Sequence, residues 1–423
     1  MARTMTAQTP QTRRAPRSPL ADKWLLDPEI SFLNHGSFGA CPTAVLERQA
    51  ELRLRMEREP VRFFVRELPA LLDQARDELA RFVGVEAQDL VFVPNVTTAV
   101  NAALQSLHLA PGDELLTTDH EYNACRNALE HVAARAGARV VVAPIPFPLR
   151  SPVQATEALL DRAGPRTRVA LVDHVTSQTG LVLPVGEMVA ALEARGVATL
   201  VDGAHAPGML PLRVAELGAT YYAANCHKWL CAPKGAGFLW ARRDRQGALH
   251  PTTISHGYNA PPRGRSRYLE EFDWTGTDDP TAALCVPDAL RHLASLVPGG
   301  WPEIMRRNRE LCLAARRVLC ATLEIEPPCP EEMLGSLAAL PLPDGTGDAP
   351  TSPLYLDPVQ DRLLFEHGIE VPVVPWPAPP KRLLRISAQL YNSLEEYERL
   401  GAALRALLGD QRTVHLARTH TGR

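Results

Sequence analysis

The chain has 423 residues, and its 45 basic and 48 acidic side chains give a formal net charge of −3. This balance gives no electrostatic reason to expect a nucleic acid partner, and no apolar run is long enough to cross a bilayer. The eight cysteines are scattered and form no Cys-x-x-Cys pair, which predicts reduced thiols in a cytoplasmic protein and no metal site. The length exceeds that of a usual single core, so we expect two domains.

The first part of the chain predicts a tail followed by a strand-and-helix domain. Residues 1–20 are basic, rich in Thr and Pro and without an apolar segment, so we expect a disordered tail rather than a secretory signal, with a transit peptide as the alternative. Short apolar runs rich in Val and Leu follow at 89–95, 113–119, 138–145, 167–175, 197–205 and 219–228. They show little polar alternation and predict strands that are buried on both faces.

Segments between these runs, such as 155–164 and 185–196, have apolar residues at helical spacing. The alternation predicts an α/β domain over 21–290, with a mostly parallel sheet that helices cover. In such sheets, ligands bind beyond the carboxyl ends of the strands.

After about residue 290 the pattern changes. Residues 301–323 form a long amphipathic pattern with Arg on its polar side, and 393–409 predict a terminal helix. Strands are predicted within 334–343, 368–376 and 383–392. Together these elements predict a smaller α+β domain over 291–412, followed by a second tail at 413–423.

Residues that could bind a ligand or take part in catalysis follow two of the predicted strands. Asp202 ends one predicted strand and is followed by His205, and His227 and Lys228 follow the next strand. Taken alone, Asp202 is an ordinary helix cap and Lys228 an ordinary solvated lysine. In this order they suit pyridoxal phosphate, which needs an acid against its pyridinium nitrogen, a lysine on its aldehyde and donors for its phosphate.

Several motifs resemble one known family. "VDGAHAPG", "NCHKW", "YNAC", "TGTDDPT" and "RISAQLYN" resemble the class V aminotransferase family of fold type I pyridoxal phosphate enzymes. "SFLNHGSFGACP" is similar to its isopenicillin N epimerase-like branch. The resemblance runs from about Trp24 to Leu408. It implies a large domain with a sheet of the seven-stranded type, a small C-terminal domain, and a homodimer with shared active sites.

The resemblance assigns roles to the residues around the lysine. Lys228 corresponds to the lysine that joins the aldehyde of pyridoxal 5'-phosphate and then acts as general base. Asp202 corresponds to the acid at the pyridine nitrogen. His205 would lie beside the 3-hydroxyl oxygen, as a cofactor contact and catalytic group. His227 and Asn225 correspond to phosphate donors.

Further cofactor contacts come from three other segments. Thr97 and Thr98 lie near a predicted helix N-terminus, where they would bind the phosphate or act as simple caps. By the resemblance, Tyr122 stacks on the pyridine ring, with His120 as the alternative. Thr277 reaches the phosphate of the other subunit, unless its segment is an ordinary glycine turn.

Three residues are assigned to the substrate. Arg385 corresponds to the arginine that binds a substrate α-carboxylate, a role that suits its planar, two-pronged guanidinium. Ser177 stands where cysteine desulfurases of the family tend to carry Asn. Asn34, in the branch motif, is a further substrate contact.

These roles predict an enzyme that acts on an α-amino acid through a Cα carbanion. An amino-acid epimerase or racemase is the first hypothesis; a carbon–sulfur lyase resembling hercynylcysteine sulfoxide lyase, or an aminotransferase, is the alternative. Sulfur transfer is disfavoured, because 361–387 contain no cysteine and Cys329 lies earlier. A catalytically silent binding protein would be expected to lack Lys228, Asp202 or Arg385, and all three are present.

Overall fold

The large part of the molecule is built on a seven-stranded sheet. The computed structural model describes residues 15–261, 264–345 and 357–420, so residues 1–14 of the predicted first tail lie outside the described residues. The strand order is β2-β8-β7-β6-β5-β3-β4. The strands are β2 (Leu90–Val93), β3 (Glu114–Thr118), β4 (Arg139–Ala143), β5 (Thr167–Asp173), β6 (Ala198–Asp202), β7 (Tyr221–Asn225) and β8 (Gly237–Ala241).

This sheet confirms the mostly parallel architecture. Within it, β8 alone runs antiparallel to its neighbours, β2 and β7. The six other strands lie inside the six predicted runs. β8 was not predicted, because its five residues directly follow a glycine-rich turn and form a shorter run than the predicted strands.

Two hydrophobic clusters cover the two faces of the sheet. Neighbouring residues of one strand belong to different clusters: Leu115 packs with α5 (Val96–Gln105) and α6 (Asn123–Ala136), whereas Leu116 packs with α7 (Pro152–Leu160) and α8 (Val185–Glu193). This alternation follows from the two-residue period of a strand. Burial on both faces explains why the strands read as continuous apolar runs.

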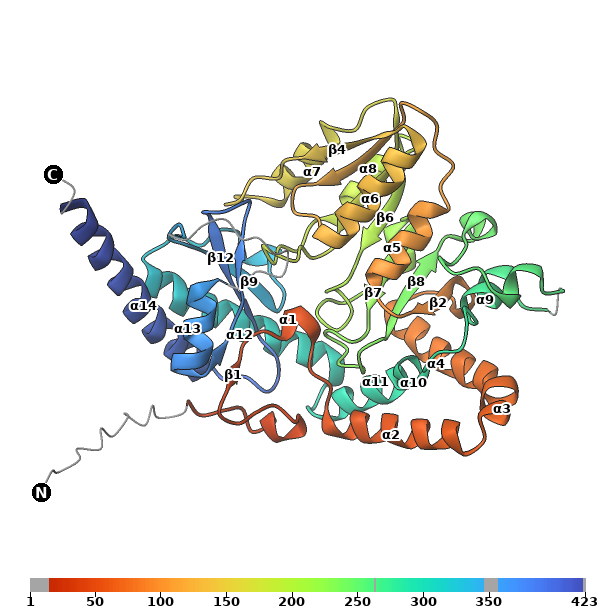
Figure 1. Ribbon diagram of the computed structural model, residues 1–423, viewed down its shortest axis with the longest axis horizontal. Helices are drawn as coiled ribbons and strands as arrows, with labels where there is room; N and C mark the ends of the chain where they lie inside the picture. The colour runs from red at the N-terminus through yellow and green to blue at the C-terminus, as the bar shows by residue number, and fades with distance from the viewer. Residues whose placement is uncertain (1–14, 262–263, 346–356, 421–423) are drawn as a thin grey trace, which may run out of the picture.

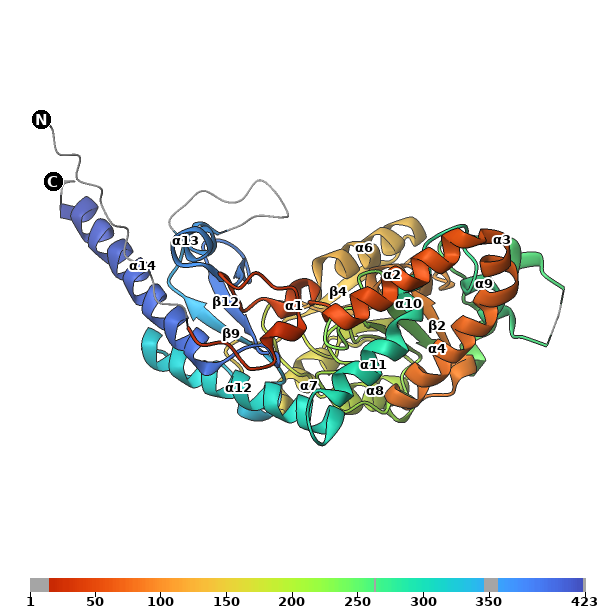
Figure 2. The same cartoon turned by 90° about the horizontal axis from the view of Figure 1, so that it is seen from below.

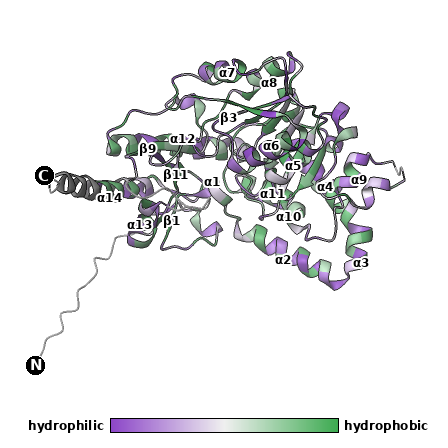
Figure 3. Cartoon of the chain, turned by 45° about the horizontal axis from the view of Figure 1, so that its top comes forward, coloured by the Kyte–Doolittle hydropathy of each residue, from purple (hydrophilic) through white to green (hydrophobic). Residues whose placement is uncertain are grey.

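The N-terminal helices pack on the large part but also contact the small one. They are α1 (His35–Phe38), α2 (Thr43–Arg58), α3 (Pro60–Arg62) and α4 (Leu68–Val83). Figure 3 shows hydrophobic and hydrophilic residues alternating along α2, as expected of a helix with one buried side. Ahead of α1, β1 (Ser31–Phe32) pairs in parallel with β10 (Ile369–Glu370) of the small part.

The small part holds a three-stranded antiparallel sheet, ordered β11-β12-β9. The predicted strand at 368–376 is divided into β10 and β11, since Pro372 between them has no N–H for a ladder. Figures 1 and 2 place this sheet and α14 at one end of the molecule, away from the seven-stranded sheet. Its elements are β9 (Leu337–Leu342), β11 (Val373–Pro375), β12 (Arg382–Ser387), α12 (Gly300–Leu323), α13 (Pro358–His367) and α14 (Leu394–His420).

The connection between the two parts is helical. It contains α9 (Arg267–Phe272), α10 (Thr281–Leu284) and α11 (Val286–Ser295), and α12 then packs on β9 and α14. We therefore propose a domain boundary near residue 290. The expected tail at 413–423 overlaps α14 up to His420, and residues 421–423 lie outside the described residues. Over the described part of the chain, no helix has both the length and the apolar character of a membrane span.

Candidate active site

The expected site residues follow strands whose carboxyl ends share one edge of the large sheet. β2, β3, β5, β6 and β7 run in the same direction, so the segments after them meet at that edge. These segments carry Asn95, Thr97 and Thr98 after β2, Tyr122 after β3, Ser177 after β5, Asp202 and His205 at and after β6, and Asn225, His227 and Lys228 at and after β7.

Lys228 is partly buried and has an imidazole as its neighbour. Its Nζ lies 3.1 Å from Nε2 of His205, and no acid side chain forms an ion pair with it among the described residues. Burial lowers the pKa of Lys228 to about 8, against the opposing charge of Asp202. Burial and the Lys228 charge also lower the pKa of His205 well below its ordinary value. A neutral imidazole therefore lies beside an amine that loses its proton easily.

Asp202 is held by neutral donors. Its Oδ1 accepts from Ala204 N at 2.9 Å, and its Oδ2 accepts from Cys125 Sγ at 3.3 Å. Burial raises the pKa of Asp202, although these hydrogen bonds oppose the rise. A cation placed against Asp202 would favour its charged form. The site thus has an acid without a cationic hydrogen-bond partner, as the pyridinium assignment requires.

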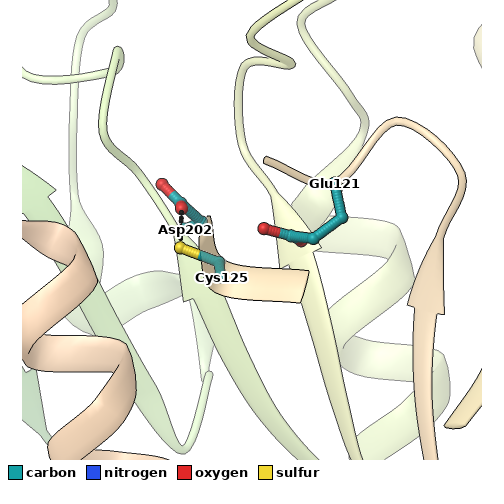
Figure 4. A group of neighbouring side chains, drawn as sticks. All are labelled: Glu121, Cys125 and Asp202. Carbon is teal, nitrogen blue, oxygen red and sulfur yellow. Dashed lines mark hydrogen bonds between the residues drawn. The ribbon is translucent and has the colours of Figure 1, made fainter. Parts of the chain in front are cut away.

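A second carboxyl group lies directly beside Asp202. Ligand atoms of Glu121, Cys125 and Asp202 lie within 4.8 Å of one another, as Figure 4 shows for the three side chains. Burial raises the pKa of Glu121 well above its ordinary value, and the same holds for nearby Asp173 and for the Cys125 thiol. Protonated groups are poor metal ligands, so these side chains are poorly suited to binding a metal ion. Glu121 and Cys125 are better suited to packing around Asp202.

The expected phosphate end is built around the N-terminus of α5. Asn95 caps this helix, with its Oδ1 accepting from Thr98 N at 2.9 Å and from Thr98 Oγ1 at 3.2 Å. Asn225 Oδ1 accepts from Val96 N at 3.1 Å. Thr98 and Asn225 are thus engaged in capping, which was the alternative role for the Thr pair. The N–H and hydroxyl of Thr97 have no partner within the described residues and remain open to an anion.

His227 follows β7, two residues after Asn225, and its hydrogen bonding depends on its protonation state. Its Nδ1–H donates to Ala236 O at 2.8 Å, and burial lowers its pKa to about 4. In the neutral ring Nε2 is therefore an acceptor. A phosphate nearby would favour the protonated ring and turn Nε2 into a donor.

The two candidates for the stacking residue differ in accessibility. His120 is fully buried, and its ring nitrogens contact Thr179 Oγ1 at 2.7 Å and Ile145 O at 3.0 Å. Tyr122 is 45% exposed. Burial raises its pKa, and the charges of Asp202 and Arg385 also act on it, so its hydroxyl lies within electrostatic range of both. This favours Tyr122 over His120.

Arg385 reaches the large part of the chain from β12. Its NH1 donates to Ser177 O at 2.7 Å and Ser177 Oγ at 3.3 Å, and its NH2 donates to Ser37 Oγ at 2.7 Å. Burial lowers the pKa of Arg385 to about 10. Its Nε is buried without a partner, and none of its partners among the described residues is a carboxylate.

The segment of the branch motif holds this arginine in place. Ser37, which was not predicted, donates from Oγ to Asn34 Oδ1 at 2.5 Å, and Asn34 Nδ2 donates to Glu370 Oε1 at 2.9 Å. Asn34 thus reaches Arg385 only through Ser37. The position of Ser37 three residues after Asn34 was the signal that could have identified it.

The same segment supports the backbone of Lys228. His35 Nε2 contacts Lys228 O at 3.0 Å, and its Nδ1 contacts Tyr391 OH at 2.8 Å. Because a carbonyl only accepts, Nε2–H donates and Nδ1 accepts from the tyrosine. Gly39 has a φ of +70°, and a Cβ there would lie 2.1 Å from His227 O. The sequence assigned no role to His35, a neighbour of Asn34.

Thr277 belongs to the segment that follows α9. It lies in the exposed turn 275–279, and none of the hydrogen bonds at the sheet edge includes it. The remaining side chains fit pyridoxal 5'-phosphate: a lysine with a lowered pKa, an acid without a cationic hydrogen-bond partner, and open donors at a helix N-terminus.

Known proteins match nearly the whole chain. The family model for class V aminotransferases (Aminotransferase class-V) matches residues 41–329. Isopenicillin N epimerase of Streptomyces clavuligerus is 39% identical over 403 residues, which are 92% of this chain and 97% of that protein. A probable chloroplastic L-cysteine desulfhydrase of Arabidopsis thaliana is 31% identical over 412 residues, covering 91% of this chain and 84% of that protein.

Two solved structures extend the comparison. A cystine C–S lyase, C-DES, in complex with its product cysteine persulfide, is 25% identical with a TM-score of 0.71 and covers 89% of this chain and 97% of that chain. A cysteine desulfurase of Thermococcus onnurineus, 20% identical, shares the fold with a TM-score of 0.74 and covers 94% of this chain and 99% of that chain. The chain therefore belongs to the class V aminotransferase family, in its isopenicillin N epimerase-like branch, and is an enzyme with pyridoxal 5'-phosphate as cofactor.

Proposed function

We propose that the enzyme is an epimerase or racemase that changes the configuration at Cα of an α-amino acid. The observation that carries this proposal is Arg385, which is 5% exposed and bonded to neutral oxygens of Ser177 and Ser37. A buried cation without a counter-ion is costly. A substrate carboxylate would neutralise this charge through parallel charge-assisted hydrogen bonds. The site thus favours substrates that carry a carboxylate.

The residues that would hold the cofactor follow from the same geometry. Lys228 would bind its aldehyde, Asp202 its pyridine nitrogen, and Thr97 with His227 its phosphate, while Tyr122 would cover the ring. Bound there, the cofactor withdraws electrons from the substrate Cα and makes its C–H bond acidic.

Lys228 is the base that this arrangement supports. With a pKa of about 8, roughly one amine in five is neutral at pH 7.4, against about one in a thousand for an ordinary lysine. The neutral amine can take the Cα proton from one face. Inversion also requires a second acid that delivers a proton to the opposite face of Cα. Arg385, by fixing the carboxylate at two points, would set the direction of the Cα–H bond relative to Lys228.

A carbon–sulfur lyase is the second candidate, supported by the similarity to the cysteine desulfhydrase and to the cystine C–S lyase. The higher identity to isopenicillin N epimerase favours epimerisation. Transfer of sulfur to a protein cysteine is disfavoured. Cys329 is 5% exposed, its backbone carbonyl accepts from Arg316 NH1 at 2.7 Å, and burial raises its pKa to about 11.

One experiment separates these outcomes. The holoenzyme is incubated in deuterated water with a panel of α-amino acids and cysteine conjugates, followed by chiral chromatography, mass spectrometry and assays for pyruvate and keto acids. We expect inversion with one deuterium at Cα and no pyruvate. Pyruvate release would identify a lyase, and keto acid formed only with an amino acceptor would identify an aminotransferase. The matching α-amino amides, which lack the carboxylate, serve as controls and should not react.

We also propose a homodimer in which Thr277 approaches the phosphate of the other subunit's cofactor. The exposed position of Thr277, which leaves it accessible to a second subunit, supports this arrangement. Light scattering should give a dimer, and Thr277→Val should weaken cofactor retention. Thr275→Val, in the same exposed turn, is the matched control. A fully active monomer would contradict the proposal.

A cytoplasmic location is proposed from the cysteines. All eight are free and buried, as expected in a reducing compartment. Fractionation of cells that produce the full chain tests this, and recovery of the protein from an oxidising compartment would refute it.

A further inference from the structure

The two ring nitrogens of His205 face different partners. Trp229 Nε1 donates to Nδ1 at 3.3 Å, and Lys228 Nζ lies 3.1 Å from Nε2. His205 and Trp229 are each 1% exposed, so water does not compete for the contact between them. The histidine therefore connects the residue that follows the lysine in sequence to the reactive amine of the lysine itself.

The contact with Trp229 favours one position for the proton of the neutral imidazole. An indole N–H can only donate, so Nδ1 must keep its lone pair. Burial keeps His205 neutral by lowering its pKa, which leaves its single proton on Nε2. In the other tautomer, two N–H groups would point at each other across 3.3 Å, and both would lack a partner. A buried donor without a partner disfavours that tautomer by about tenfold or more.

We propose that Trp229 is a positioning residue that holds His205 in its Nε2–H tautomer, so that His205 donates toward Lys228 Nζ instead of accepting from it. A donor in this place stabilises the neutral amine and opposes the ammonium. Trp229 thus acts through His205 to keep Lys228 able to take a proton.

The surroundings of Trp229 make the indole a rigid donor. Its ring packs on His35 at a centroid distance of 4.8 Å, and His35 in turn contacts Lys228 O. On the other side, Gly208 lies so close that a Cβ there would be 2.6 Å from Trp229 O. With both its ring and its backbone in contact, Trp229 has little freedom to turn its N–H away from His205.

The tautomer is measured on the full-length holoenzyme with ¹⁵N-labelled histidine, by long-range ¹H–¹⁵N NMR spectra. His205→Gln identifies the His205 signals by their loss. We expect Nε2 protonated and Nδ1 bare in the parent, and a substantial Nδ1–H population in Trp229→Phe. Trp301→Phe is the matched control, because it removes another buried indole N–H, bonded to Leu290 O at 3.0 Å, in α12. It should leave the His205 signals unchanged.

A protonated Nδ1 in the parent protein overturns the proposal. This measurement uses the parent alone, so it does not depend on whether a variant folds. A Trp229→Phe spectrum identical to the parent overturns it as well. Neither NMR measurement depends on which amino acid is turned over. A negative NMR result therefore refutes the role of Trp229 without refuting the proposed function. Only the pH profile described next rests on the proposed function.

The pH profile gives the functional readout. Exchange of the substrate Cα–H requires neutral Lys228, so its rate rises with pH through the pKa of that amine. Loss of the donor to the amine should move this rise upward by several tenths to about one pH unit in Trp229→Phe, corresponding to a two- to tenfold change in the protonation equilibrium. A rise at the same pH as in Trp301→Phe contradicts the proposal.

Discussion

Replacing Arg385 by Lys tests the proposed carboxylate contact most directly. The substitution keeps the charge but replaces a planar fork by a single ammonium. In the structure the guanidinium donates to Ser177 O and to Ser37 Oγ, each at 2.7 Å. A lysine ammonium cannot form both of these hydrogen bonds and bind a carboxylate as well. Loss of one charge-assisted hydrogen bond costs about 1.5–3 kcal/mol, which lowers kcat/KM about ten- to a hundredfold.

The assay combines turnover with Cα hydrogen exchange in deuterated water. We expect both to fall together, while the visible absorption of the cofactor–lysine linkage stays unchanged. Arg382→Lys is the matched control. It alters another buried arginine of β12, which is paired with Asp357 at 2.8 Å. If Arg385→Lys turns over as fast as the parent, the carboxylate binds elsewhere and the argument from the buried guanidinium fails.

Four further outcomes are expected. Borohydride should fix the cofactor on a peptide that contains Lys228, and labelling at Lys234 would refute the assignment. Attachment of pyridoxal phosphate to the apoprotein needs the neutral amine, so its rate should rise with pH up to about 8 and be level above; a rise that continues to pH 10 would contradict the lowered pKa of Lys228. Ser37→Ala should raise KM several-fold with a smaller change in kcat, because it releases one side of the guanidinium. Gly39→Ala should lower the free energy of unfolding by about 1–3 kcal/mol, from backbone strain and the clash with His227 O. Gly112→Ala, at a φ of +86° with nothing within 4 Å, separates strain from clash, and an equal loss in both variants would exclude the clash.

The sequence alone was enough to predict the mostly parallel sheet and to propose Asp202 and Lys228 as parts of one site. Its strands are buried on both faces, so their apolar runs could be recognised without any knowledge of neighbours. Asp202 and Lys228 each come directly at or after such a run. In a parallel sheet, residues that follow strands meet at one edge, which is why local sequence was enough to bring these two together.

Other assignments depended on distant segments. Arg385 meets Ser177 and Ser37 across separations of 208 and 348 residues. Asn34 also has a remote partner, since its amide is bonded to Glu370 as well as to Ser37, while its substrate contact stays a prediction. The hydrogen bonds at α5 likewise show that Thr98 N–H and Asn225 Oδ1 are engaged at the helix N-terminus, which residue type does not reveal, while their phosphate contacts stay predictions.

The tertiary structure also decided the tautomers and the charge states. Trp229 appeared in sequence only as the residue after the lysine, and its N–H finds His205 because two turns at one sheet edge fold against each other. Burial by the surrounding elements lowers the pKa of Lys228 and of Arg385. A local pattern reports the period and the burial of its own segment. The hydrogen-bond partner and the desolvation of a side chain depend on which remote segment packs against it. Only the tertiary structure supplies this information.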